Sequence, residues 1–204
     1  MLAAIELTAV ITSAIYGVFL GRHKNFDIVG LFTVASLVAF GGGTLRDLFL
    51  DRHPLFWIAN SHYPPIVFGI AVIGALLPPT FGRIKPILHV PDALGLALFT
   101  IVGAAYAREA ETSLFIAALL GAVTGTFGGV LGEVVCNEVP SLFRSAPLYA
   151  TCSFVGAWIY LLGLSLPLDP SVIALAAAAV IVLFRLAAVR WNLRLPESSP
   201  PEGP

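Results

Sequence analysis

Long apolar stretches, separated by short polar or proline-containing segments, dominate this chain. A membrane-spanning helix needs about 20 apolar residues, and seven stretches approach that length. They cover residues 4–20, 27–50, 66–77, 90–106, 114–135, 148–164 and 171–189. The third is short unless His62-Tyr63-Pro64-Pro65 forms its interfacial start. The pattern predicts an all-α integral membrane protein with seven transmembrane helices.

The sequence repeats itself 86 residues further on. Gly42 and Gly43 match Gly128 and Gly129, and Asp47 matches another acid, Glu133. The same offset aligns the pairs Ile15/Ile101, Gly17/Gly103, Arg22/Arg108, Pro54/Pro140, Tyr63/Tyr149 and Phe68/Phe154. Each half holds three spans, an odd number, so the second half must enter the membrane from the opposite side. We therefore predict two inverted three-helix repeats and a seventh helix outside them.

This organisation divides the chain into four parts. Residues 1–86 form the first repeat and its linker, and residues 87–166 form the second, inverted repeat. Residues 167–194 hold the seventh helix. The segment 195–204 is rich in proline and serine, and we expect it to be a disordered cytoplasmic tail.

Lysine and arginine are distributed unequally between the two predicted sides. The side reached after the first, third, fifth and seventh spans carries eight of the 11: Arg22, Lys24, Arg83, Lys85, Arg144, Arg185, Arg190 and Arg194. The other side carries Arg46, Arg52 and Arg108. Because cytoplasmic loops are enriched in these residues, we predict the amino terminus outside the cell and the carboxyl terminus in the cytoplasm.

Composition supports the membrane assignment and excludes several functions. Hydrophobic residues make up 58% of the chain and charged residues 11%, against about 25% charged in soluble domains. The net charge of -1 argues against a nucleic-acid partner. The four histidines lack metal-ligand spacing, no catalytic constellation is visible, and we expect neither a metal or cofactor nor an enzyme. Cys136 and Cys152 are predicted to be buried single thiols.

The glycine blocks Gly41-Gly42-Gly43 and Gly128-Gly129 interrupt two spans. Each glycine costs about 1 kcal/mol relative to alanine inside a helix, and clustered glycines favour a kink or local unwinding in the protein interior. The alternative is close helix packing, because Gly121, Gly125 and Gly129 recur at every fourth position.

A polar stripe follows the second block. Thr126, Gly129, Glu133 and Asn137 share one helix face, and their repeat equivalents are Phe40, Gly43, Asp47 and Asp51. Two such helices facing a hydrated pore would place Asp47 and Glu133 toward opposite mouths. The alternative is that these carboxylates are interfacial anchors.

Arg46 presents a separate question. It points about 100° away from Asp47 on a helix, so we expect it to seek another partner. Glu6, Asp92 and the helix-end carbonyls are the candidates. Glu6 and Asp92 are themselves repeat equivalents near the start of a span, where an interfacial position is the simplest interpretation.

These motifs resemble a known family. Gly41-Gly42-Gly43-Thr44-Leu45-Arg46-Asp47 followed by Pro54, and Gly128-Gly129 to Glu133 followed by Pro140, are similar to the prokaryotic branch of the trimeric intracellular cation (TRIC) channels, also labelled glycine transporters. The resemblance covers about residues 4–189. It implies a symmetric homotrimer in the prokaryotic plasma membrane, in contact with lipid. It also implies one potassium-permeable pore per protomer and kinks at the two glycine blocks.

The chain departs from the family at one position. An arginine commonly precedes the acid of the second copy, whereas this sequence has Gly132-Glu133, which predicts a less symmetric pore. The lysine-containing lipid motif of animal members is absent. Our first hypothesis is a monovalent-cation channel whose glycine hinges shape the pore, with Arg46, Asp47, Thr126 and Glu133 lining or gating it. The alternatives are a secondary transporter of a small solute such as glycine, and a membrane scaffold.

Overall fold

The computed structural model describes residues 1–78 and 85–196. The regular elements of this part of the chain are helices, listed in order: α1 (Leu2–His23), α2 (Ile28–Phe49), α3 (Phe56–Ala59), α4 (Tyr63–Leu76), α5 (Lys85–Glu109), α6 (Leu114–Val135), α7 (Ala150–Gly163) and α8 (Pro170–Arg190). The predicted tail is described only at Leu195 and Pro196. Its remainder, and Arg83 of the linker, lie outside the described residues.

The all-α prediction is confirmed, with one addition and one qualification. Helices α1, α2, α5, α6 and α8 are long and apolar enough to cross a membrane. Helices α4 and α7 are also apolar but have 14 residues each. The start of α4 is as expected, since Tyr63 opens it and prolines occupy its first turn, where no amide donor is needed. The four-residue helix α3 was not expected.

Helix boundaries follow the 86-residue offset. Helices α2 and α6 begin at Ile28 and Leu114 and end at Phe49 and Val135. Equivalent side chains cap their amino ends: Asp27 Oδ1 accepts from Gly30 N at 2.8 Å, and Ser113 Oγ accepts from Ile116 N at 3.4 Å. Left-handed residues also follow the helices in pairs, at Asn25/Glu111 and Asp51/Asn137. The two halves therefore use the same local signals to start and stop their helices.

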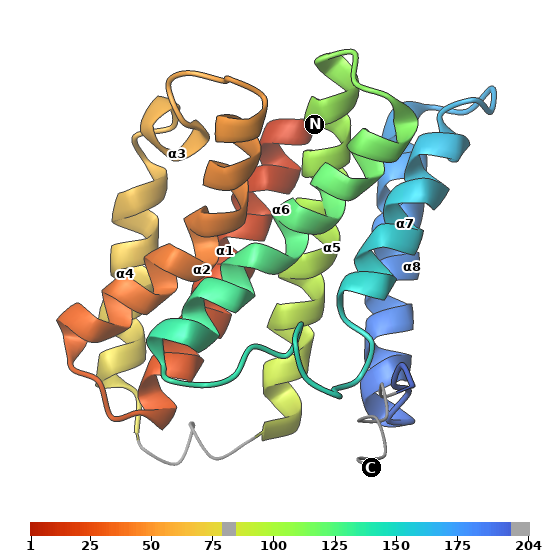
Figure 1. Cartoon of the computed structure of the whole chain (residues 1–204). Coiled ribbons are helices and arrows are strands. Elements are labelled where there is room, and N and C mark those ends of the chain that lie inside the picture. Colours follow the sequence, from red (N-terminus) through yellow and green to blue (C-terminus); the bar gives the residue numbers. More distant parts are fainter. Residues whose placement is uncertain (79–84, 197–204) are drawn as a thin grey trace, which may run out of the picture.

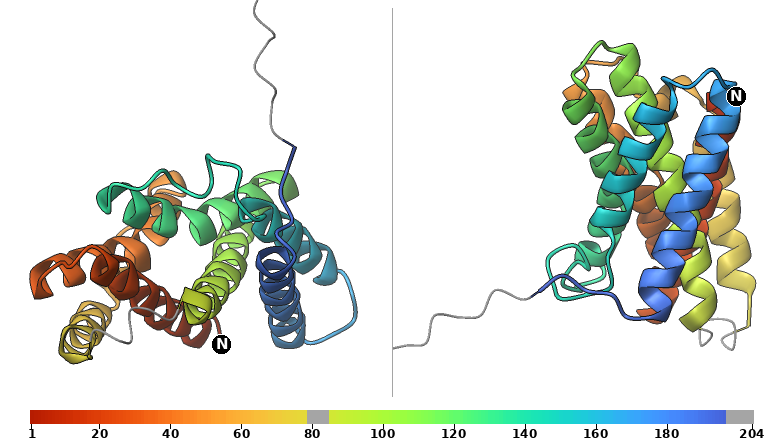
Figure 2. Two further views of the ribbon diagram at one scale, coloured as in Figure 1. Left: turned by 90° about the horizontal axis from the view of Figure 1, so that it is seen from below. Right: turned by 90° about the vertical axis from the view of Figure 1, so that its right-hand side faces the viewer.

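Successive long helices run alternately down and up the bundle, so the amino terminus and the end of α8 lie at opposite ends (Figure 1). Helices α1, α2, α5 and α6 form the middle of the molecule, with α4 on one side and α7 and α8 on the other (Figure 2). Helix α2 ends at the top of Figure 1 and α6 ends at the bottom. Asp47 and Glu133, each two residues before its helix end, consequently lie toward opposite ends of the bundle.

Helices α2 and α6 cross with their backbones almost in contact. A Cβ atom on Gly42 would lie 2.0 Å from the carbonyl oxygen of Thr124, and one on Gly128 would lie 2.1 Å from that of Val38. Val38 and Thr124 are repeat equivalents, so each half presents the same surface to the other. Both glycine blocks remain α-helical, and no glycine of the described residues has a positive φ. Close packing therefore accounts for Gly42 and Gly128, and no local unwinding occurs.

Gly42→Ala should destabilise the fold, because its methyl group cannot fit against the Thr124 carbonyl without moving α6. Overpacking of this kind costs about 1–3 kcal/mol, so we expect a lower melting temperature of the detergent-purified protein. The matched control is Gly69→Ala on α4, where no atom lies within 4 Å of the added Cβ. Equal melting temperatures for the two variants would contradict the close backbone contact of α2 and α6 at Gly42.

Candidate functional site

The buried charged side chains of the described residues gather in two sets, one toward each end of the bundle. The upper set, at the top of Figure 1, is Glu6, Arg46 and Asp47, which are 2%, 0% and 1% exposed. The lower set is Asp92, Glu133 and Arg185, which are 6%, 8% and 7% exposed. Ionised groups inside a membrane protein need partners or water. The contacts within each set therefore show how these buried charges are compensated.

In the upper set, Arg46 bridges both carboxylates. Its Nε donates to Asp47 Oδ1 at 2.9 Å and its Nη1 donates to Glu6 Oε1 at 3.3 Å. Its guanidinium also lies 4.6 Å from the ring centre of Tyr106. Glu6 is thus confirmed as a partner. The expectation that Arg46 turns away from Asp47 was wrong, because its long side chain folds back at a buried site that favours ion pairing.

In the lower set, Arg185 of α8 pairs with Asp92 of α5. Its Nε and Nη2 donate to Asp92 Oδ2 at 3.3 and 3.1 Å, and its Nη1 donates to the carbonyls of Pro147 and Leu148 at 3.0 and 2.9 Å. Tyr149 donates its hydroxyl to Asp92 Oδ1 at 3.2 Å. Arg185 was counted among the basic residues of the predicted cytoplasmic side. It lies toward the same end of the bundle as the others of that set, but it is buried, because α8 packs against α5.

The interfacial interpretation of Glu6 and Asp92 is also wrong. Both side chains are buried, and each accepts hydrogen bonds from an arginine. Their proximity to a helix start suggested water contact. The neighbouring helices extend past those positions and cover them, which the sequence of one helix cannot reveal.

Asp47 and Glu133 hold the segment that follows their helix. Asp47 Oδ2 accepts from the Phe56 backbone amide at 2.7 Å. Glu133 accepts from both the amide and the hydroxyl of Ser141, each at 2.7 Å. Charge-assisted bonds of this type are among the stronger hydrogen bonds in proteins. The two acids therefore have equivalent roles, each fixing the loop at one end of the bundle.

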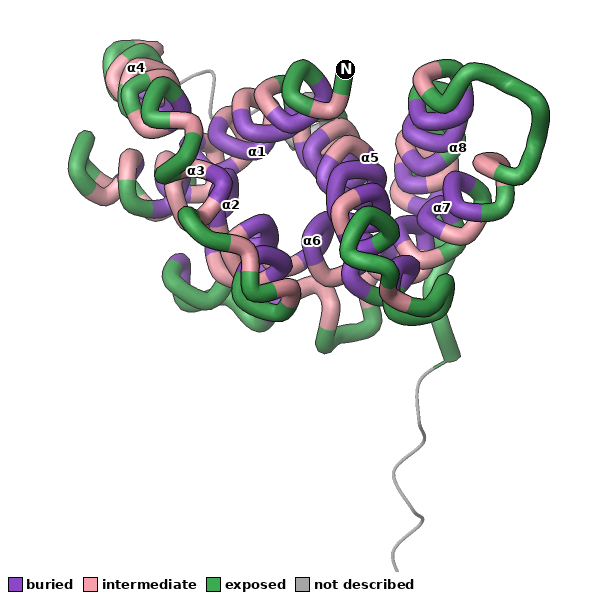
Figure 3. Tube along the Cα trace, turned by 90° about the horizontal axis from the view of Figure 1, so that it is seen from above, coloured by how far each residue is buried: buried purple, intermediate pink, exposed green. Residues whose placement is uncertain are grey.

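Helices α1, α2, α5 and α6 surround a common centre (Figure 3). A small, partly polar cavity is lined by residues of these four helices and by Tyr149. It leaves about 10 Å³ for the centre of a water molecule, roughly the room for one water. Its lining comprises Ser13, Tyr16, Val38, Asp92, Leu96, Phe99, Thr124, Gly125, Gly129 and Tyr149. Val38/Thr124 and Ser13/Phe99 are repeat pairs, so the cavity lies where the two halves meet.

The residues singled out from the sequence lie at different places around this cavity. Gly129 lines it, and its added Cβ would lie 2.8 Å from the Tyr149 hydroxyl. An added Cβ on Gly43 would meet the Phe56 ring, and one on Gly41 would meet the Leu131 side chain. Thr126 is buried but donates its hydroxyl to Ala122 O of its own helix at 2.7 Å. Its neighbours Thr124 and Gly125 line the cavity instead.

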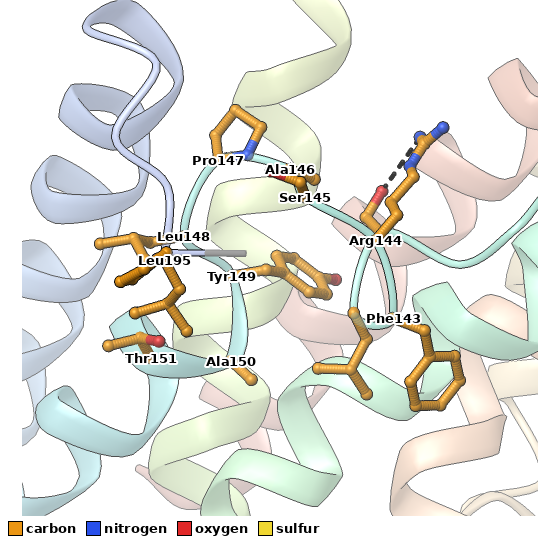
Figure 4. Close-up of a pocket in the computed structure, with 13 residues that line it drawn as sticks. Phe143, Arg144, Ser145, Ala146, Pro147, Leu148, Tyr149, Ala150, Thr151 and Leu195 are labelled. Atoms are coloured by element: carbon orange, nitrogen blue, oxygen red, sulfur yellow. Dashed lines mark hydrogen bonds between the residues drawn. The ribbon is translucent and has the colours of Figure 1, made fainter. Parts of the chain in front are cut away.

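A wider pocket of about 650 Å³ opens at the lower end of the bundle, between the loop after α6 and the residues after α8 (Figure 4). Residues 141–151, from the loop after α6 and the first residues of α7, form most of its wall. Arg144 donates to Ser141 Oγ there at 3.4 Å. Tyr149 lines both this pocket and the central cavity. Its ring therefore stands between the two spaces.

Several lining residues were not found from the sequence, namely Ser13, Tyr16, Phe99 and Thr124. The repeat pairing of Tyr63 with Tyr149 was a signal for Tyr149, and an arginine within an apolar span was a signal for Arg185. Single hydroxyls and aromatic rings in a span carry no comparable signal. Both cysteines are free and buried, as predicted.

Two carboxyl groups outside the spans titrate below their ordinary range. A hydrogen bond from the Lys24 ammonium lowers the pKa of Glu138. This contact joins the loop after α1 to the loop after α6. Hydrogen bonds from Ser171 lower the pKa of Asp169, which caps α8.

At the level of sequence, the chain matches a protein-family model and is similar to several bacterial membrane proteins. A family model described as "Glycine transporter" matches the chain twice, over residues 3–79 and 89–165. A UPF0126 membrane protein of Vibrio cholerae is 34% identical over 197 residues, covering 96% of this chain and 82% of the relative. The UPF0126 inner membrane protein YadS of Escherichia coli K12 is 32% identical over 200 residues, covering 94% and 93%.

The chain is also similar in structure to solved prokaryotic TRIC channels. The TRIC trimeric intracellular cation channel orthologue from Rhodobacter sphaeroides is similar with a TM-score of 0.85 and 28% identity, covering 94% of this chain and 98% of that one. A prokaryotic TRIC channel crystallised in 0.5 M KCl is similar with a TM-score of 0.84 and 25% identity, covering 95% and 98%.

Arg46→Gln should lower stability more than most single changes, because it leaves two buried carboxylates without their cation. Breaking a buried ion pair from one side costs about 3–5 kcal/mol. Thermal unfolding in detergent measures the loss, with the exposed Arg190→Gln on α8 as control. In the double variant Glu6→Gln/Arg46→Gln part of the loss should be recovered. A strictly additive double variant would show that the pair is not coupled.

Proposed function

Because this chain belongs to the prokaryotic branch of the trimeric intracellular cation channel family, we propose that it is a monovalent-cation channel permeable to potassium. One pore would run through each protomer of a homotrimer in the prokaryotic plasma membrane. The observation that carries the proposal is the central cavity, which hydroxyl groups line and buried carboxylates flank toward both ends of the bundle.

The proposed pathway follows the axis between α1, α2, α5 and α6. Hydroxyl oxygens of Ser13, Tyr16 and Thr124 can replace part of the hydration shell of a cation. Carboxylates at either end provide an attractive field for cations. At the cavity itself the space admits about one water, so passage of a hydrated ion requires widening.

We propose that the glycine blocks permit this widening. Gly43 and Gly129 lie on the carboxyl-terminal side of the α2–α6 crossing, against the aromatic side chains of Phe56 and Tyr149. The ribbons of α2 and α6 change direction along their length in Figure 1, which supports bending within these two helices. Arg46, Asp47, Thr126 and Glu133 are proposed to line or gate the pathway around them.

The proposed topology has seven spans, with α4 and α7 completing two inverted three-helix repeats and α8 added. The alternating helix directions and the double match of the family model support it. Exposed or half-buried basic residues favour the lower end: Arg22, Lys24, Arg144, Arg190 and Arg194 lie there, and Arg52 and Arg108 lie at the upper end. We therefore propose the lower end, with the carboxyl terminus, as cytoplasmic.

The family label keeps transport of a small solute such as glycine as the second candidate. A transporter of this kind commonly holds a substrate carboxylate at the amino end of a broken helix. Helices α2 and α6 are continuous from their caps onward. Neither offers such an end beside the cavity, and this favours the channel over the transporter. An enzymatic role receives no support from relatives described as channels or membrane proteins.

Purified protein in a planar bilayer under a potassium chloride gradient should give discrete current steps that reverse near the potassium equilibrium potential. Glu133→Gln should reduce the conductance, because it removes one carboxylate from the lower end. If no current is recorded and proteoliposomes accumulate labelled glycine, the channel proposal is wrong and the transporter proposal is supported.

Gly129→Leu should reduce or abolish the current, because the added side chain would meet the Tyr149 hydroxyl and occupy the cavity. Gly69→Leu on α4 is the matched control, since open space surrounds its Cβ position. The hinge proposal would be abandoned if Gly43→Leu and Gly129→Leu both conducted as the control does.

A further inference from the structure

Helix α8 lies outside the repeat, yet it supplies one member of the lower set of charges. In the upper set, the first half provides all three members, Glu6, Arg46 and Asp47. Their repeat equivalents are Asp92, Gly132 and Glu133. The second half therefore provides both carboxylates and lacks the arginine.

Position 132 is closely packed, which leaves no free space for an arginine there. A Cβ atom on Gly132 would lie 2.4 Å from Val38 Cγ2 and 3.3 Å from Leu20 Cδ1. Both atoms belong to the first half, on helices that pack against α6. A side chain at this position would therefore have to displace the Val38 side chain.

Arg185 makes one of the two ion pairs that an arginine at position 132 would be expected to make. It pairs with Asp92, as Arg46 pairs with the equivalent Glu6. Its guanidinium lies 4.6 Å from the ring centre of Tyr149, and that of Arg46 lies 5.1 Å from the ring centre of Phe56. Each arginine is buried, so each end of the bundle contains two buried carboxylates and one buried cation.

We propose that Arg185 of α8 takes the place of the arginine that the second half lacks, and that it balances the charge at the lower end of the ion pathway. The proposal rests on the channel function proposed above. Asp92 lines the central cavity, so its charge faces the pathway. Arg185 neutralises that charge and keeps cation entry from the two ends comparable. Helix α8 is then part of the conducting unit as well as packing on α5 and α7.

The consequence is a measurable asymmetry of current. Removing the guanidinium leaves an uncompensated carboxylate at one end of a low-dielectric pathway, where charge acts strongly. Cations should then enter more readily from the lower end than from the upper end. In symmetric potassium chloride, the ratio of single-channel currents at equal positive and negative voltages should depart from the wild-type ratio by about twofold or more.

The experiment compares single-channel currents of four variants with the wild type. Arg185→Gln should show the altered ratio, and Arg185→Lys, which retains the charge, should keep the wild-type ratio. Asp92→Asn/Arg185→Gln removes both charges and should restore the wild-type ratio. Arg190→Gln, an exposed arginine on the same helix, is the matched control and should leave the ratio unchanged. A role confined to folding would alter yield or stability without altering this ratio.

The outcomes separate the two proposals. A wild type without current overturns the channel function, and the inference with it. A conducting wild type with an unchanged ratio in Arg185→Gln overturns the inference alone, as does an altered ratio that persists in Asp92→Asn/Arg185→Gln. If Arg185→Gln does not assemble into a channel, the current ratio of Asp92→Asn tests the inference in its place. That variant leaves the guanidinium uncompensated, so its ratio should shift from that of the wild type, and an unchanged ratio would again overturn the inference.

Discussion

The contact between the backbones of α2 and α6 is the constraint on which the rest of the structure depends. Gly42 and Gly128 each face a carbonyl oxygen of the other helix at a distance that excludes any side chain. Because the crossing joins equivalent positions of the two halves, the carboxyl ends of α2 and α6 point to opposite ends of the bundle. This places Asp47 and Glu133, and the charges around them, where cations would enter and leave the proposed pathway.

A second constraint follows from the surroundings of those charges. An ionised side chain buried in a membrane protein is costly unless another charge or hydrogen-bond donor compensates it. Each end meets this requirement with one buried arginine and a set of hydrogen bonds. Arg46 bridges Glu6 and Asp47, whereas Arg185 pairs with Asp92, and Glu133 accepts hydrogen bonds from Ser141. Arg46 belongs to the repeat, whereas Arg185 belongs to α8. The symmetry of the charges is therefore closer than the symmetry of the sequence.

The sequence was sufficient to predict features that depend on local pattern. The apolar spans, the 86-residue offset and the equivalence of Asp47 with Glu133 are examples, and Glu6 was one of three candidate partners for Arg46. Features set by packing between distant segments were not predicted correctly. Arg185 was counted only among the basic residues of one side, because nothing near it in the sequence shows that it pairs with Asp92. Ser13 and Tyr16 likewise became visible as cavity residues only when α1 was placed against α2, α5 and α6.

The crossing also limits how the proposed pathway can widen. Val38 and Thr124 supply the carbonyls at the crossing, and both residues line the central cavity. The central cavity therefore lies beside the backbone contact of α2 and α6. Sliding α2 past α6 there would break that contact, so the crossing is better regarded as a fixed point. Movement is then restricted to the helix segments beyond it, where Gly43 and Gly129 contact aromatic side chains whose rings can shift at lower cost than a backbone. On this argument the glycines have two separate uses: Gly42 and Gly128 hold the halves together, and Gly43 and Gly129 allow each half to bend.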